Sequence, residues 1–174
     1  AARAADIPAE HALQGFDGVR AFASVPAASA PLLASLGFTA ADAPGAWRLG
    51  GAERHAWYLF DEPPSERGIP GAGTIHHVAW SAADDAELDE ARGVVGGAGA
   101  HPTGIVDRQY FHSVYFREPS GVLFELATRD IGFTFDEPLE TLGTELRLPP
   151  QHEHLRDELE HRLTPLPDPR ADDA

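Results

Sequence analysis

Short apolar runs separated by Gly, Pro and Asp recur along residues 15–131 and predict a series of short strands and helices. In the first half of this stretch we expect a strand, a short helix and three more strands, at residues 19–23, 27–36, 38–41, 46–49 and 55–60. Pro26 precedes the helix and Gly37 follows it, and these two residue types favour helix starts and helix ends respectively. The predicted order is β-α-β-β-β.

The second half repeats this order. A strand, a helix and three strands are predicted at residues 74–81, 84–96, 103–108, 113–117 and 122–128. Asp84 or Asp85 is the expected N-cap of the helix, and the spacing of Leu88 and Val95 gives it one buried face. An internal repeat of about 55 residues indicates two copies of one supersecondary unit. We therefore predict an α+β fold in which two tandem βαβββ modules form a curved mixed sheet.

Pro- and Gly-rich segments and a shift in composition after Gly132 divide the chain. The predicted parts are a linker at 1–14, the first module at 15–62, a linker at 63–73, the second module at 74–131, and a tail at 132–174 with a charged helix at 152–163. His152, His154 and His161 lie among Glu and Arg residues of that helix, so we interpret them as solvent-exposed side chains rather than as a metal cluster.

Composition narrows the classes of function. The formal net charge is −15, which disfavours binding to nucleic acid or to anionic membranes. The absence of Cys excludes disulfides and thiolate metal sites, and no apolar run approaches the ~20 residues that span a bilayer. We expect a cytoplasmic location by default. The sequence has no Met, which favours a piece of a longer protein.

The adjacent His76 and His77 and the distant Glu125 are the strongest candidates for chemistry. Glu125 lies between Phe124 and Leu126 in an apolar strand, where a carboxylate needs a metal, an arginine or a hydrogen-bond donor. Neighbours on a strand face opposite sides, so one of the two histidines can reach a given cavity. One imidazole and one carboxylate make two thirds of a 2-His-1-carboxylate site. The alternatives are a core histidine and an ion pair of Glu125 with Arg108 or Arg117.

Polar side chains also alternate along the segment between these candidates. Arg108, Tyr110, His112 and Tyr115 alternate with neighbours that include the apolar Phe111 and Val114, and two of them facing a cavity would offer a cation and a phenol to an anionic oxygen substrate. The alternative is surface decoration of a hairpin.

Together these motifs resemble the vicinal oxygen chelate superfamily, which includes glyoxalases, bleomycin resistance proteins and extradiol dioxygenases, and most closely its hydroquinone-type ring-cleaving dioxygenases. The matching segments are Ile7-Pro8-Ala9-Glu10-His11-Ala12, Gly15-Phe16, Gly73-Thr74-Ile75-His76-His77-Val78-Ala79, Asp107-Arg108-Gln109-Tyr110-Phe111, Tyr115-Phe116-Arg117-Glu118-Pro119, Phe124-Glu125-Leu126-Ala127-Thr128, Asp136-Glu137-Pro138 and Leu148-Pro149-Pro150.

The resemblance implies a role for each candidate. His77 and Glu125 would be metal ligands, His76 an acid/base group, and Arg108 and Tyr115 substrate contacts. The implied metal is Fe(II), with Mn(II), Zn(II) or Ni(II) as alternatives, and the implied reactants are a small aromatic substrate and O2. The implied reaction is Fe(II)- and O2-dependent opening of a hydroquinone-type ring. Two other functions stay open: a glyoxalase-like metal-dependent lyase or isomerase, and a non-catalytic resistance protein that binds aromatic compounds or drugs.

The chain departs from this family at one ligand. Members of the family are about twice as long, and their first module donates a second histidine. Here Asp17-Gly18-Val19 stands where the second module has His76-His77-Val78. The resemblance therefore implies a C-terminal half that obtains a histidine from a missing N-terminal half or from another subunit of an oligomer. The alternative is a degenerate protein that stands alone.

Overall fold

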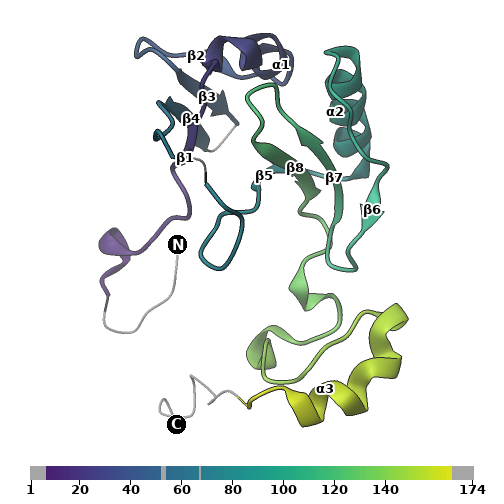
Figure 1. The fold of residues 1–174 in the computed structure, drawn as a ribbon. Coiled ribbons are helices and arrows are strands. Elements are labelled where there is room, and N and C mark those ends of the chain that lie inside the picture. Colours follow the sequence, from purple (N-terminus) through teal and green to yellow (C-terminus); the bar gives the residue numbers. More distant parts are fainter. Residues whose placement is uncertain (1–6, 52–53, 67, 166–174) are drawn as a thin grey trace.

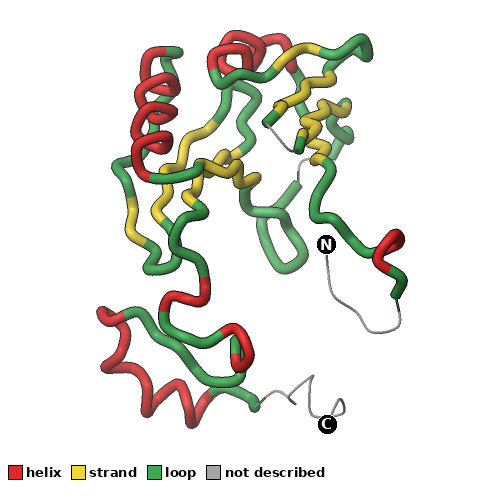
Figure 2. The backbone as a smooth tube through the Cα atoms, turned by 180° about the vertical axis from the view of Figure 1, so that it is seen from behind, coloured by secondary structure: helices red, strands yellow, loops and turns green. Residues whose placement is uncertain are grey.

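The computed structural model describes residues 7–51, 54–66 and 68–165, and within them two modules of the same topology lie side by side (Figures 1 and 2). The first module consists of β1 (Gly18–Phe22), a 3-10 helix (Pro26–Ser29), α1 (Ala30–Ser35), β2 (Thr39–Ala40), β3 (Ala46–Gly50) and β4 (His55–Asp61). The second consists of β5 (Val78–Ala82), α2 (Asp85–Gly97), β6 (Val106–Asp107), β7 (His112–Arg117) and β8 (Leu123–Thr128).

Each module forms its own four-stranded mixed sheet. The strand orders are β1-β4-β3-β2 and β5-β8-β7-β6, in which the first strand pairs in parallel with the last and the other pairs are antiparallel. The α+β class and the internal repeat are thus confirmed, and the curved mixed sheet predicted from the sequence is divided into two. The exact boundaries of the predicted linkers stay a prediction.

The ends of the elements follow local chemistry. Asp84 is the N-cap of α2, since its carboxylate accepts hydrogen bonds from the backbone N–H groups of Ala86 and Glu87 at 3.0 Å. The short helix predicted over 27–36 is present as two consecutive parts, a 3-10 helix followed by α1. Pro31 lies at the start of α1 and has no N–H to bond the carbonyl of Ala27, so a continuous α-helix cannot run through both turns.

One hydrophobic core joins the two modules. Leu32 and Leu33 of α1 and Leu88 and Val95 of α2 are buried in the same cluster as residues from both sheets. The ring of Tyr58 on β4 lies 5.2 Å from that of Phe124 on β8 and 5.9 Å from that of Trp80 on β5, centroid to centroid. The modules are therefore packed layers of one unit rather than independent bodies.

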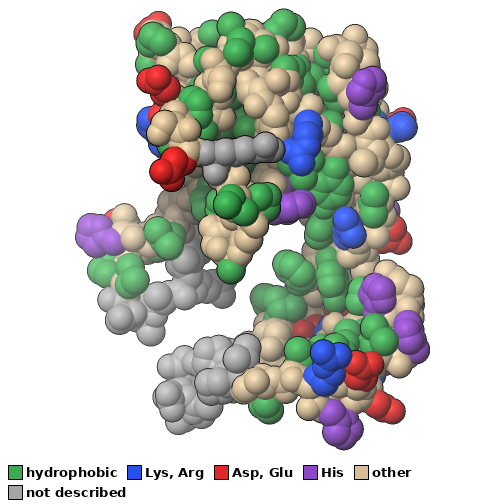
Figure 3. All heavy atoms as spheres, viewed as in Figure 1, with side chains coloured by type: hydrophobic (Ala, Val, Ile, Leu, Met, Phe, Trp, Pro, Cys, Tyr) green, Lys and Arg blue, Asp and Glu red, His purple; other side chains and the backbone are tan. Residues whose placement is uncertain are grey.

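The tail extends from the end of β8, away from α1 and α2 (Figures 1 and 2). It contains 3-10 helices at Phe133–Phe135, Leu139–Thr141 and Pro150–Leu155, followed by α3 (Arg156–Arg162). The charged helix predicted over 152–163 thus consists of a 3-10 helix followed by α3. His152, His154 and His161 are exposed as predicted, and Figure 3 shows charged and histidine side chains at the surface of this segment. No helix in the described ranges has the length and hydrophobicity to cross a membrane.

A buried carboxylate also ties the modules together. Glu118, in the turn between β7 and β8, is 1% exposed and accepts hydrogen bonds from the backbone N–H groups of Ser120 and Val122, each at 3.0 Å. The hydroxyl of Ser29, from the first module, donates to the same carboxylate. All three donors offset the cost of burying the charge.

We expect Ser29→Ala to lower the free energy of unfolding by about 2 kcal/mol, because it removes one hydrogen bond to a buried charge. Urea unfolding followed by tryptophan fluorescence measures this change. Ser35→Ala is the matched control, since Ser35 is exposed and its hydroxyl bonds within its own helix. Equal destabilisation by the two substitutions would contradict this account of the Ser29 contact.

Candidate functional site

The strand register places His77 beside Glu125. Glu125 lies on β8, opposite Ala79 of β5 on one side and Tyr115 of β7 on the other. His77 lies just before β5, two residues from Ala79. His77 Nε2 lies 2.9 Å from Glu125 Oε2, and the Tyr115 hydroxyl donates to Glu125 Oε1 at 2.5 Å. The Glu125 side chain is 4% exposed and that of His77 36%.

His76 joins this group through His77. The Nδ1 atoms of the two rings lie 3.0 Å apart, so one ring donates a hydrogen bond to the other. Among the described contacts His77 alone of the two reaches Glu125, but the prediction of a strand from residue 74 that contains both histidines is wrong. β5 begins at Val78, and the preceding chain is not bound by strand alternation.

Arg108 completes the group from the turn between β6 and β7. Its guanidinium carbon lies 5.6 Å from the centroid of the Tyr115 ring, which in turn lies 6.0 Å from the ring of His77. The five residues predicted from the sequence therefore form one continuous series of contacts, in the order Arg108, Tyr115, Glu125, His77, His76. Glu125 is bound by His77 and Tyr115 instead of by an arginine.

Tyr110 and His112 lie elsewhere. The Tyr110 hydroxyl donates to Asp136 in the tail at 2.9 Å. His112 Nδ1 lies 2.6 Å from Asp85 at the start of α2. The hydrogen bond to Asp85 raises the pKa of His112, and the charges of Asp85, Asp107 and Asp130 act in the same direction. Neither side chain contributes to the group around Glu125.

The donor atoms fit part of a metal site. An imidazole nitrogen and a carboxylate oxygen at contact distance are ligands that Fe(II), Mn(II), Zn(II) and Ni(II) accept. Because the side chain of Glu125 is buried, a bound cation would offset the free-energy cost of burying its charge. In the described part of the chain, however, no group of three or more His, Cys, Asp or Glu residues lies close enough to hold a metal ion. The described residues thus offer two candidate ligands, His77 and Glu125.

The first module has no polar side chain at the positions that correspond to His77, Glu125 and Tyr115. Because Val19 pairs with Tyr58 as Val78 pairs with Phe124, the registers make Gly18, Leu59 and Ala46 the counterparts of His77, Glu125 and Tyr115. A Cβ atom added to Gly18 would lie 2.4 Å from the carbonyl oxygen of Trp57. The first module therefore has no room for a ligand side chain at this position.

Residues 22–126 match the family model described as the glyoxalase/bleomycin resistance protein/dioxygenase superfamily. The chain belongs to this superfamily. Its relatives in the superfamily include the Bacillus subtilis (strain 168) protein named "Putative ring-cleaving dioxygenase MhqA", 46% identical over 109 residues, which are 63% of this chain and 34% of that protein. The chlorohydroquinone/hydroquinone 1,2-dioxygenase of Sphingobium indicum is 42% identical over 102 residues, 57% of this chain and 30% of that enzyme.

A solved structure shows the same superfamily fold over a longer range. The crystal structure of a "putative dioxygenase" from Bacillus subtilis subsp. subtilis str. 168 matches with a TM-score of 0.76 at 34% identity, over 88% of this chain and 51% of that one. The chain thus spans about a third of the length of the curated relatives and about half of the solved chain.

Sequence reasoning missed two residues that bear on this site, Gln109 and Asp136. Gln109 is the single non-glycine residue with a positive φ among the described residues, at 69°. Asp136 lies 27 positions later and contacts it. Both lie in segments that carry the family resemblance, but a contact between distant loops leaves no periodic signal.

We expect Gly18→Ala to lower the free energy of unfolding by about 3 kcal/mol, because the added Cβ meets backbone rather than a flexible side chain. Gly93→Ala, inside α2 with open space around the Cβ position, is the control and is expected to be neutral or stabilising by up to about 1 kcal/mol. Thermal and urea unfolding measure both. A Gly18→Ala variant as stable as the parent would show that this position can hold a side chain.

We expect the contribution of His112 to stability to fall as pH rises. Its pKa is raised in the folded state, so the stabilisation is complete below the unfolded value of about 6.5 and is lost as pH passes the folded value. The difference in unfolding free energy between the parent and His112→Gln should shrink from about pH 6 to about pH 9. A difference in unfolding free energy that grows with pH would contradict a raised pKa of His112 in the folded state.

Proposed function

We propose that this chain is the C-terminal half of a metal-dependent ring-cleaving dioxygenase that opens a hydroquinone-type ring with Fe(II) and O2. The observation that carries the proposal is the 2.9 Å approach of His77 Nε2 to the buried carboxylate of Glu125. Two relatives bear names of ring-cleaving dioxygenases, and one of these names specifies hydroquinone. The proposed substrate class follows from that name and from the cation and phenol beside the ligand pair.

His77 and Glu125 would hold the metal, which when bound would supply redox chemistry and sites for the oxygen atoms of substrate and O2. The remaining residues act on the organic partner. The hydroxyl of Tyr115 fixes one carboxylate oxygen of Glu125, and this leaves the other for the cation. Arg108 would offset negative charge on a substrate oxygen near the Tyr115 ring. His76 Nδ1 is engaged by His77, so its Nε2 would exchange the proton.

The third protein ligand would come from outside the described residues. A histidine of an N-terminal half, or of another subunit in an oligomer, is the proposed source. Three observations support this: the two-ligand group, the absence of room at Gly18, and the length of the relatives. The most direct experiment therefore uses the complete gene product that contains this chain.

We expect Glu125→Gln to lower bound iron at least about tenfold and to abolish oxygen uptake with hydroquinone, because a neutral amide replaces an anionic ligand. Iron content after anaerobic loading with Fe(II) and uptake at an oxygen electrode measure the two effects. Glu145→Gln is the control, since Glu145 is an exposed glutamate of the tail paired with Arg147.

Unchanged iron content in Glu125→Gln would defeat the ligand assignment. Turnover of a carbonyl substrate with Zn(II), in the absence of oxygen uptake with Fe(II), would instead support a glyoxalase-like lyase or isomerase. Binding of an aromatic compound after treatment with EDTA, without turnover under either metal, would support a non-catalytic resistance protein.

A further inference from the structure

The turn that carries Arg108 has an unusual backbone. Gln109 has φ 69°, in the left-handed region that side chains other than Gly, Asn and Asp seldom adopt. Three local hydrogen bonds shape the turn: Gln109 N–H to Asp107 Oδ1 at 2.7 Å, Arg108 N–H to the carbonyl of Phe111 at 2.9 Å, and Tyr110 N–H to the carbonyl of Arg108 at 2.8 Å. A conformation of this kind costs on the order of 1 kcal/mol and persists where its surroundings hold it.

Residues of the tail make the contacts that stabilise this turn. Asp136 Oδ2 accepts one hydrogen bond from Gln109 Nε2 and another from the Tyr110 hydroxyl, both at 2.9 Å. Gly132 N–H donates to the carbonyl of Tyr110 at 2.9 Å, and the ring of Phe133 lies 5.1 Å from that of Tyr110. Burial, followed by the bond to Asp136, raises the pKa of Tyr110.

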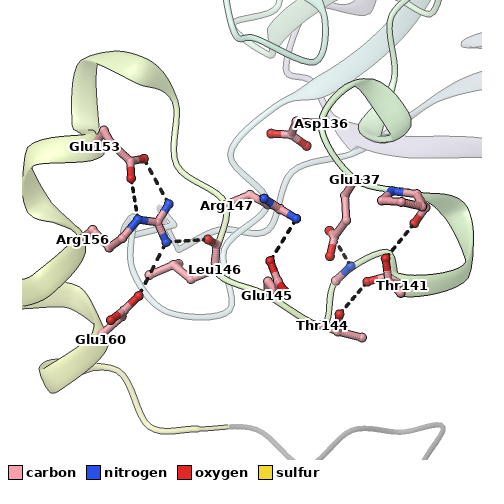
Figure 4. A network of polar contacts seen from close by, with 12 residues as sticks. Asp136, Glu137, Thr141, Thr144, Glu145, Leu146, Arg147, Glu153, Arg156 and Glu160 are labelled. Carbon is pink, nitrogen blue, oxygen red and sulfur yellow. Dashed lines mark hydrogen bonds and ion pairs between the residues drawn. The ribbon is translucent and has the colours of Figure 1, made fainter.

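The segment that follows Asp136 is held by a polar network of its own (Figure 4). The next residue, Glu137, is 4% exposed and accepts a hydrogen bond from Gly143 N–H at 2.9 Å. Further along, Arg156 donates to the carbonyl of Leu146 at 3.0 Å and forms ion pairs with Glu153 and Glu160. The carboxylate that binds the turn therefore belongs to a segment that is held by its own hydrogen bonds and ion pairs.

We propose that Asp136 is a positioning residue: by binding Gln109 and Tyr110 it fixes the turn that holds the guanidinium of Arg108 over the ring of Tyr115. The tail then acts on the candidate site through two loops, although no residue of the tail touches His77 or Glu125 among the described contacts. The structural part of this proposal is independent of the reaction. Its effect on substrate binding rests on the proposed function.

The first test reads the position of Arg108 directly. A proton on the face of an aromatic ring is shifted upfield, so the Nε–H resonance of Arg108 in the full chain should be upfield in the parent and return toward the unstacked value in Tyr115→Leu. We expect Asp136→Ala to move this resonance at least half as far as Tyr115→Leu does. Asp136→Asn retains an acceptor oxygen for both donors and should preserve most of the upfield shift.

The matched control is Glu137→Ala, which removes a buried tail contact beside Asp136 but touches neither Gln109 nor Tyr110. We expect it to lower Tm and to leave the Arg108 resonance in place. Two results would overturn the proposal: an unmoved Arg108 resonance in Asp136→Ala, or an equal displacement in Glu137→Ala, which would mean that any loosening of the tail has the same effect.

The second test measures the consequence for the proposed reaction. With hydroquinone as the probe, Asp136→Ala should raise KM about tenfold with a smaller change in kcat, and it should add little in combination with Arg108→Ala. Full additivity of the two substitutions would contradict transmission through Arg108. Absence of turnover in the parent protein would defeat the proposed function, and the resonance measurements would still decide the positioning role.

Discussion

The carboxylate of Glu125 is the constraint on which the site depends. It lies on a strand flanked on both sides, at 4% exposure, where an unpartnered charge costs several kcal/mol. Its partners are therefore fixed by the sheet: Tyr115 lies directly opposite on one neighbouring strand, and His77 reaches it from just before the other. One hydrogen-bond donor and one imidazole therefore meet a buried carboxylate, and this is the geometry on which the proposed ligand pair rests.

Much of this arrangement follows from the sequence because it depends on local patterns. Short apolar runs and Gly or Pro punctuation predict the repeated βαβββ order, and a glutamate between Phe124 and Leu126 marks a buried charge that needs a partner. The contact between His76 and His77 was not predicted, because it depends on β5 starting at Val78 rather than at residue 74. The hydrogen bond between Gln109 and Asp136 was not predicted either, since the two residues lie in irregular segments 27 positions apart.

The two modules share their topology but differ in the side chains at the candidate site. Both keep the same strand order, the same parallel pair and a helix that buries leucine against the sheet. At the positions that matter for a ligand, however, one has His77, Glu125 and Tyr115 and the other has Gly18, Leu59 and Ala46. The close approach of Gly18 to Trp57 leaves no room for a ligand side chain at this position of the first module. Two modules with the same topology thus carry different side chains at the same position of the fold.

The first module nevertheless supports the site by covering the back of β8. Phe124 faces the shared core, where it contacts Tyr58 of the first module and Trp80 and Phe116 of the second. The neighbouring Glu125 faces the opposite side, toward His77 and Tyr115. Because consecutive side chains alternate across a strand, the packing of Phe124 sets the direction of Glu125. The Ser29 hydroxyl on Glu118, seven residues before Glu125, closes the same interface at the β7–β8 turn. A module without ligands therefore fixes the orientation of the one buried carboxylate that the candidate site requires.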